Sequence, residues 1–235
     1  MAGNYRELRT RFFDLLLLTA LSAMVIFPAL GQNRQWASRE VRHAEIIREM
    51  VESGDYLIPR LLGEVYHDKP PVMHVIAAGL TRMAGKPSMM IARMPSAVAG
   101  IVGVLAVYGI GLLLLDRRSA LVGAVVLLGM PGYSVVARHA RPDTILCATI
   151  LCACLCIGLA MRERRYAWQT GYLILGGLCA GLGVITKGPY GILVPVFFMV
   201  FAPFRREDFT RPRFNWASFV LGFLTALAIW AVPAY

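Results

Sequence analysis

The sequence predicts an all-α integral membrane protein, a bundle of about seven spans with juxtamembrane helices in the first extracytoplasmic loop. Of its 235 residues, 57% are hydrophobic, and the mean hydropathy is +0.60. Soluble domains are only about 45–50% apolar, and several runs here approach the ~18 apolar residues typical of a transmembrane helix. We therefore interpret residues 1–235 as one membrane domain, with residues 31–90 forming the extracytoplasmic loop.

The first predicted span covers residues 12–30. Arg6, Arg9 and Arg11 precede it, and they predict a cytoplasmic N-terminus because basic residues collect on that side of a membrane. No small-residue cleavage site follows, which favours a retained signal anchor. Six later spans are predicted at residues 91–115, 120–137, 144–161, 171–186, 190–204 and 215–235.

Residues 70–85 decide the predicted topology, because they are apolar but short for a span and contain His74, Thr81 and Arg82. If they do not cross, the basic connectors fall inside, as the positive-inside bias requires. These connectors contain Arg117, Arg118, Arg162, Arg164, Arg165, Arg205, Arg206, Arg211 and Arg213. We therefore expect a surface or re-entrant helix at 70–85; the alternative is a hairpin of two full crossings over residues 70–115.

The net charge of +10 is interpreted as a topology signal. The basic residues lie in short loops between spans rather than on one soluble face, so no nucleic-acid partner is expected. The five cysteines lie inside apolar runs, where they are predicted to be small packing residues. Neither a cysteine zinc site nor a disulfide framework is expected from their spacing.

Charged residues at predicted span ends are candidate functional residues, because an ionisable group near hydrocarbon is costly and is usually paired or functional. Lys187 precedes Gly188-Pro189, which breaks a helix and lets the ammonium face a cavity; snorkelling to the headgroups is the alternative. Asp143 follows Arg138 and Arg141 at a helix corner. Either it forms a structural ion pair with one of these arginines, or it orients a catalytic group or an acceptor.

The segment from Tyr66 to Pro71 holds a lysine, Lys69, against two prolines that restrict the backbone. A lysine fixed at the membrane surface is suited to bind a lipid-linked phosphate as a point charge; a solvated turn is the alternative. His74 is predicted to be a packed or interfacial histidine. Four nearby side chains could instead hold a divalent metal such as zinc or manganese, although no tight spacing demands one: Glu40, His43, His67 and Asp68.

Residues 36–74, with the run ARMPSAVAGIVGVLAVY after them, resemble the N-terminal half of the polyprenyl-phosphate-dependent glycosyltransferases of the GT-C type. This family includes aminoarabinose transferases that act on lipid A and dolichyl-phosphate-mannose protein mannosyltransferases. The later elements ARHARPD and TKGP resemble the family in the same order, and the resemblance extends to residue 203. It implies a longer multi-span enzyme whose site lies on the extracytoplasmic face, where a sugar on a polyprenyl phosphate passes to an acceptor.

The resemblance also implies roles for individual residues. The family's first loop begins with two acids and then an arginine; here Arg39 replaces the first acid, and Glu40 and Arg42 match the others. Glu40 or Asp143 is then the implied catalytic base. The implied donor-phosphate ligands are Lys69, Arg42, Lys187 and Tyr66.

The predicted function is inverting transfer of a sugar from a polyprenyl phosphate to a lipid, glycan or protein acceptor at the cell membrane. The polyprenyl-phosphate-linked sugar is expected as the donor substrate, no cofactor is predicted with certainty, and a divalent metal stays an open alternative. One alternative is a transporter or flippase for an anionic lipid, whose charges would lie near the membrane midplane. Another is an inactive binding module, favoured by the end of the chain at Tyr235.

Overall fold

The computed structural model describes residues 2–31, 38–68, 70–202 and 216–231, and every structural statement here concerns these residues. The elements are α1 (Ala2–Ile26), the 3-10 helix η1 (Phe27–Ala29), α2 (Ser38–Ser53), β1 (Arg60–Leu61), β2 (Glu64–Val65), α3 (Val72–Ala84), α4 (Met89–Leu114), α5 (Arg117–Gly129), α6 (Pro131–Ala137), α7 (Pro142–Arg162), α8 (Tyr166–Lys187), α9 (Tyr190–Phe201) and α10 (Trp216–Ala231).

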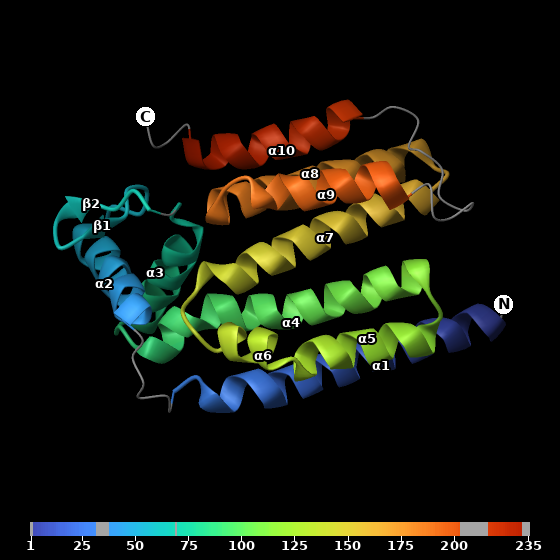
Figure 1. Cartoon of the computed structure of the whole chain (residues 1–235), viewed down its shortest axis with the longest axis horizontal. Helices are drawn as coiled ribbons and strands as arrows, with labels where there is room; N and C mark the ends of the chain where they lie inside the picture. The colour runs from blue at the N-terminus through green and yellow to red at the C-terminus, as the bar shows by residue number, and fades with distance from the viewer. Residues whose placement is uncertain (1, 32–37, 69, 203–215, 232–235) are drawn as a thin grey trace.

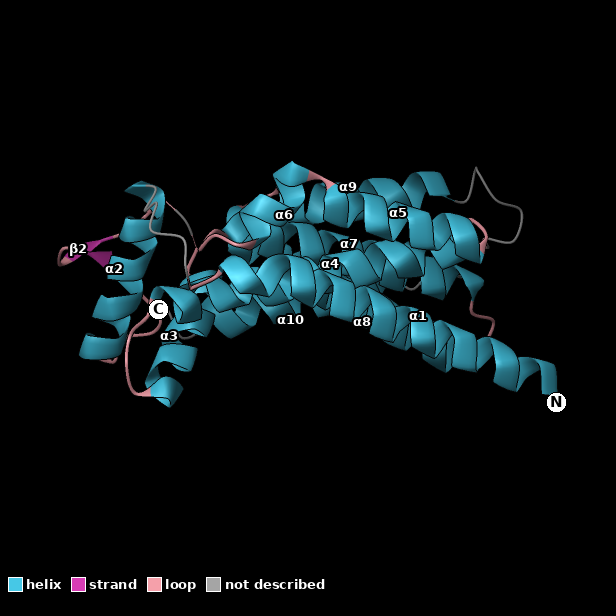
Figure 2. Ribbon diagram, turned by 90° about the horizontal axis from the view of Figure 1, so that it is seen from below, coloured by secondary structure: helices cyan, strands magenta, loops and turns pink. Residues whose placement is uncertain are grey.

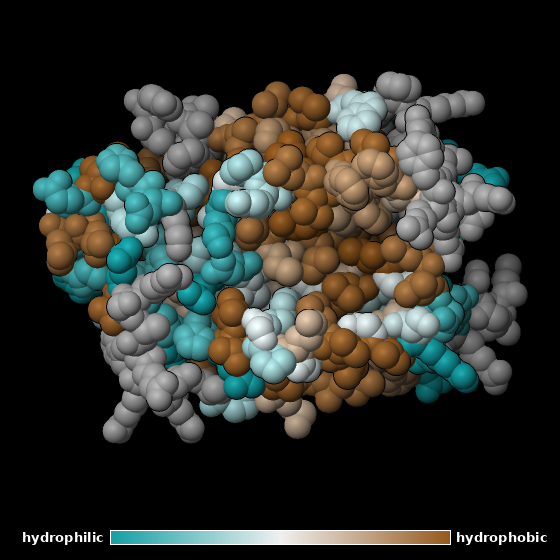
Figure 3. All heavy atoms as spheres, in the orientation of Figure 1, coloured by the Kyte–Doolittle hydropathy of each residue, from teal (hydrophilic) through white to brown (hydrophobic). Residues whose placement is uncertain are grey.

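The long helices lie side by side along one direction, and α2, α3 and the β1–β2 hairpin gather at one end of this bundle (Figure 1). α7 packs between α4 and α8, while α10 covers α8. Figure 2 shows the same division between the bundle and its end group from below. On the face drawn in Figure 3, hydrophobic residues cover the middle of the bundle, whereas hydrophilic residues predominate on the end group. This distribution is that of an integral membrane protein.

Three helices are long and apolar enough to cross a membrane: α4, α7 and α8. They confirm the spans predicted at residues 91–115, 144–161 and 171–186. α9 and the apolar part of α10 are shorter than a span, and α1 is not among the candidates. Among the described residues the candidates are therefore three, or four if a bent pair counts as one, and the predicted number of about seven is not confirmed.

The span predicted at residues 120–137 is not one straight helix. α5 and α6 meet at a bend of 65° around Met130. Pro131 explains the break, because it has no amide hydrogen to continue the helix and it disfavours helical backbone at the preceding residue. Met130 is accordingly extended, with φ −69° and ψ 119°. The bend turns α6 toward the ends of α4 and α7, where Tyr133 donates a hydrogen bond to the Gly100 carbonyl at 2.7 Å.

The helix expected within residues 70–85 is α3, which has only 13 residues. It is about 20 Å long at 1.5 Å per residue, shorter than the hydrocarbon core of about 30 Å. Its inner face packs on α2 in a cluster that includes Ile46, Met50, Ala77 and Ala78. α3 is therefore part of the end group rather than a candidate span.

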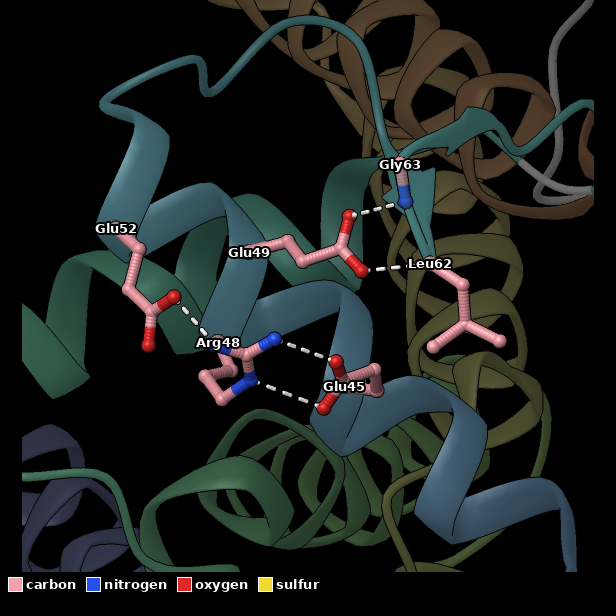
Figure 4. Close-up of polar contacts among 6 residues, drawn as sticks. All are labelled: Glu45, Arg48, Glu49, Glu52, Leu62 and Gly63. Carbon is pink, nitrogen blue, oxygen red and sulfur yellow. Dashed lines mark hydrogen bonds and ion pairs between the residues drawn. The ribbon is translucent and has the colours of Figure 1, made fainter.

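The β1–β2 hairpin is the one departure from the all-α prediction in the described chain. Its turn places Leu62 at φ 57° and Gly63 at φ 85°. The Glu49 carboxylate of α2 accepts hydrogen bonds from the Leu62 amide at 2.6 Å and the Gly63 amide at 3.2 Å (Figure 4). The preceding residue, Arg48, pairs with Glu45 and Glu52 on the same helix. The hairpin is thus fixed to α2 by side chain to backbone contacts.

At the opposite end of the bundle, Asp14 of α1 joins α4 and α5. Its carboxylate is 4% exposed and accepts two hydrogen bonds from Arg117 and one from Tyr108, each at 2.6 Å. Replacing Asp14 with Asn should cost about 1–3 kcal/mol of unfolding free energy, because charge-assisted hydrogen bonds of a buried group are lost. Thermal unfolding in detergent measures this loss.

The matched control for Asp14→Asn is Glu7→Gln, because Glu7 pairs with Arg11 on the surface of the same helix. Exposed pairs of this kind contribute only about 0.3–0.5 kcal/mol. Equal changes in the two variants would contradict the structural role of Asp14.

Candidate functional site

A cavity of about 390 Å³ lies where the ends of several helices meet the end group. Because Asp143 lies in the first turn of α7 and Lys187 is the last residue of α8, the cavity is at the bundle's end. The lining residues come from α2, α6, the α6–α7 turn, α7 and α8: His43, Gly132, Tyr133, Val136, Arg141, Asp143, Thr144, Cys147 and Lys187.

The central contact of the cavity is an ion pair in which the Lys187 ammonium donates to the Asp143 carboxylate. The two side chains are 38% and 35% exposed. Gly188 ends α8 at φ 85°, a conformation that favours glycine, and Pro189 precedes α9. The sequence prediction that Asp143 pairs with Arg138 or Arg141 is therefore wrong about the partner, because the end of α8 brings Lys187 to Asp143 instead.

Arg141, which occupies the N-cap position of α7, lines the same cavity. Ser96 of α4 fixes this corner: its hydroxyl donates to the Arg141 carbonyl at 2.7 Å and accepts from the Arg141 amide at 3.2 Å. With Arg141, Lys187 and Asp143, the lining carries a formal excess of one positive charge. The N-terminal end of a helix also favours anions, so this cavity is suited to an anionic group.

His43 enters the cavity wall from α2, and His74 of α3 lies behind it. His43 Nδ1 and His74 Nε2 are 2.8 Å apart, a hydrogen-bond distance. The two side chains are 2% and 1% exposed. The sequence predicted His74 only as a packed or interfacial residue and missed its pairing with His43. The two histidines lie on different helices and are 31 residues apart in the sequence, so no local spacing indicated their contact.

Glu40 lies outside the cavity lining, in a buried ion pair with Arg93 of α4. Arg93 Nε and Nη2 contact the two carboxylate oxygens at 3.1 and 2.9 Å, and the Ala140 amide donates to one of them at 2.8 Å. Burial raises the pKa of Glu40, but the hydrogen bonds from Arg93 and Ala140 outweigh it and leave that pKa below 4.5. Because both carboxylate oxygens are occupied and the residue is 1% exposed, the structure does not support Glu40 as a catalytic base.

Two other residues predicted to hold the donor phosphate, Arg42 and Tyr66, are not among the described residues that line the cavity. Arg42 is 47% exposed, and its closest approach to Asp68 is 3.8 Å. Tyr66 packs its ring edge toward His74, with ring centres 6.4 Å apart. Lys69 lies outside the described residues. Of the three predicted ligands that the structure describes, Lys187 is the one that lines the cavity.

The proposed metal ligands do not assemble in the described part of the chain. His43 lines the cavity, whereas His67 and Asp68 are exposed on the segment after the hairpin. No group of three or more His, Cys, Asp or Glu side chains placed to bind a metal occurs among the described residues. The metal hypothesis therefore gains no support from the geometry.

Comparison with known proteins identifies the family and the fold of this chain. The family model "Dolichyl-phosphate-mannose-protein mannosyltransferase" matches residues 68–232. An undecaprenyl phosphate-alpha-4-amino-4-deoxy-L-arabinose arabinosyl transferase of Yersinia enterocolitica is 28% identical over 181 residues, which are 77% of this chain and 32% of that protein. The second such transferase of Sodalis glossinidius is 32% identical over 182 residues, again 76% and 32% of the two chains.

The similarity extends to solved structures. ArnT from Cupriavidus metallidurans, bound to undecaprenyl phosphate, superposes with a TM-score of 0.78 at 25% identity, covering 93% of this chain and 40% of that one. An Archaeoglobus fulgidus oligosaccharyltransferase has the same fold, with a TM-score of 0.57 at 12% identity, covering 95% and 33%. This chain spans about a third of the length of the curated relatives it matches. Because the family model covers more than half of its residues, the chain belongs to the dolichyl-phosphate-mannose-protein mannosyltransferase family, whose GT-C fold the sequence resemblance had predicted.

Proposed function

We propose that this chain carries the donor site of a glycosyltransferase that moves a sugar from a polyprenyl phosphate to a lipid, glycan or protein acceptor. The observation that carries the proposal is the cavity with Arg141, Lys187 and Asp143 at the end of an apolar bundle. A polyprenyl-phosphate sugar is a phosphodiester with one negative charge on an apolar tail. Its phosphate suits the positive cavity and its tail suits the membrane, and undecaprenyl phosphate is bound by the related ArnT.

The chemistry follows from the charges. When the bond between the anomeric carbon and the phosphate oxygen breaks, the phosphate gains a second negative charge. Lys187 and Arg141 are placed to stabilise that charge, as fixed cations do for a developing anion. Asp143 then accepts the proton of an acceptor hydroxyl. Lys69 is proposed as a further phosphate ligand on the family resemblance alone.

The site is proposed to face the extracytoplasmic side, because the predicted topology puts the basic connectors in the cytoplasm. The alternative of a lipid transporter requires charges near the midplane with access from both sides. Here Arg141, Asp143 and Lys187 all lie at helix ends, on the side of the bundle that carries α2 and α3. Their position favours an enzyme site over a translocation path.

Replacing Lys187 with Met tests the donor site. The variant removes one cation from the cavity and the contact that Lys187 makes with Asp143. Because Lys187 is 38% exposed, we expect a moderate loss, about tenfold in Kd for undecaprenyl phosphate, which corresponds to about 1.4 kcal/mol. The measurement is lipid binding to the detergent-purified chain.

The matched control is Arg162→Gln, which removes an exposed cation from the other end of α7. It should leave the affinity unchanged. If both variants weaken binding equally, the effect is general electrostatics of a basic protein, and the proposed donor site is wrong.

A further inference from the structure

The geometry points to a further binding residue in this cavity: we propose that His43, oriented by His74, donates a hydrogen bond to the phosphate of the donor and takes up a proton when that anion binds. The inference rests on the proposed function. It assigns a role to two histidines that the family resemblance left without one. His43 is then a ligand of the donor, and His74 is its positioning residue.

The 2.8 Å contact limits what the pair can hold. Each neutral imidazole has one N–H and one bare nitrogen. The contact uses Nδ1 of His43 and Nε2 of His74, so one of these nitrogens carries the bridging hydrogen. Both cannot be protonated at the contact without placing two hydrogens between them. The bonded pair is therefore neutral or carries a single positive charge.

The surroundings bias this choice. His43 and His74 are only 2% and 1% exposed, and such burial disfavours the positively charged form of the pair. The groups around the pair differ by element. On α2, Glu40 is bound to Arg93 of α4, and Arg42 lies beside Asp68. Tyr66, on the segment after the hairpin, packs toward His74. The remaining titratable groups line the cavity and come from α6, the α6–α7 turn, α7 and α8: Tyr133, Arg141, Asp143, Cys147 and Lys187.

In the cavity itself, Arg141 and Lys187 repel an added proton on His43, and Asp143 already accepts from Lys187. The excess of positive charge favours the neutral pair. A bound phosphate reverses this, because its negative charge and acceptor oxygens favour the protonated form of a nearby imidazole. Because the contact with His74 uses Nδ1 of His43, we assign Nε2 of His43 to the phosphate. The hydrogen on it is a donor in the protonated pair.

Proton uptake on binding has a measurable consequence. By linkage, a site that binds one more proton in its occupied state gains affinity as the pH falls, by at most about tenfold per pH unit. The decisive probe is farnesyl methyl phosphate, a phosphodiester that lacks the second ionisation, near pH 6, of a phosphate monoester. Any proton exchanged near neutral pH then comes from the protein.

The experiment is calorimetric titration of the full 235-residue chain in detergent with this diester, at several pH values between 6 and 8.5 and in two buffers of different ionisation heat. We expect up to one proton taken up per diester bound, and a Kd that falls as the pH is lowered. His43→Gln keeps a neutral hydrogen-bonding side chain and should bind without proton uptake. The matched control His139→Gln changes a half-buried histidine outside the cavity lining and should keep the wild-type uptake.

The positioning role of His74 is tested separately with His74→Phe, which keeps an aromatic ring but removes the nitrogen facing His43. We expect reduced proton uptake in this variant with His43 intact. Saturable diester binding by the wild type without proton uptake would overturn the inference while leaving the proposed donor site standing. Absence of diester binding at every pH would overturn both. The wild-type proton count decides the question even if a histidine variant does not fold.

Discussion

Replacing Arg93 with Met is expected to have the largest effect on stability, a loss of about 3–5 kcal/mol in unfolding free energy, because it leaves one buried charge without its partner. Arg93 and Glu40 are each 1% exposed, and Arg93 also donates to the Leu30 carbonyl at 2.7 Å. The pair joins α2 to α4 and to the end of η1. The measurement is detergent-based thermal or denaturant unfolding of the purified variant.

The control for Arg93→Met is the double replacement Glu40→Leu with Arg93→Met, which removes both charges. It should be clearly more stable than the single variant, because an apolar pair often replaces a buried ion pair at little cost. If the double variant is no better than Arg93→Met, the loss arises from packing around Arg93 and not from the stranded carboxylate.

The same pair predicts the acid sensitivity of the end group. The pKa of Glu40 is lower in the folded chain than its ordinary value of 4.5. The ionised carboxylate therefore contributes stability that is present above about pH 4.5 and is lost as the pH falls through the lower folded pKa. Glu40→Gln should remove this part of the acid dependence, which a pH series of unfolding temperatures measures.

The largest effect on activity is expected for Asp143→Asn, a loss of about 10²- to 10⁴-fold in the rate of sugar transfer to a hydroxyl acceptor, the range of a general base. Donor binding should persist or tighten, because the carboxylate no longer competes with the phosphate for Lys187. The two effects separate a catalytic role from a binding role. Single-turnover transfer and donor affinity, measured on the same preparation, provide the comparison.

Transfer at the wild-type rate by Asp143→Asn would contradict the base role. A phosphate acceptor brings no proton to be removed, so this result would point to that acceptor class. Loss of donor binding together with transfer would instead show that Asp143 is needed to shape the cavity around Lys187.

Sequence reasoning found the parts of the site that local chemistry marks. Asp143 follows a proline at a helix start, and Lys187 precedes Gly188 and Pro189 at a helix end. Charges beside helix breakers indicate the ends of spans, and the structure brings both residues to one cavity. The apolar runs at residues 91–115, 144–161 and 171–186 likewise correspond to α4, α7 and α8, because local composition and length indicate such helices.

The missed features depend on contacts distant in sequence. Glu40 and Arg93 are separated by 53 residues, and nothing local distinguishes a carboxylate held by an arginine from one that faces a substrate. The contact between His43 and His74 also joins residues that are distant in the sequence, so no local pattern indicates it. Pro131 interrupts the span predicted at residues 120–137 and indicates a break at Met130. The apolar residues on both sides of the proline favoured one continuous span instead.

The most direct test of the account is binding of an undecaprenyl-phosphate-linked sugar to the purified chain, compared with the double variant Arg141→Gln with Lys187→Met and the control Arg162→Gln with Arg164→Gln. We predict saturable binding by the wild type and by the control, and its loss in the cavity variant. Equal binding by the cavity variant, or no saturable binding by a folded wild-type chain, would contradict the claim that this cavity is the donor site.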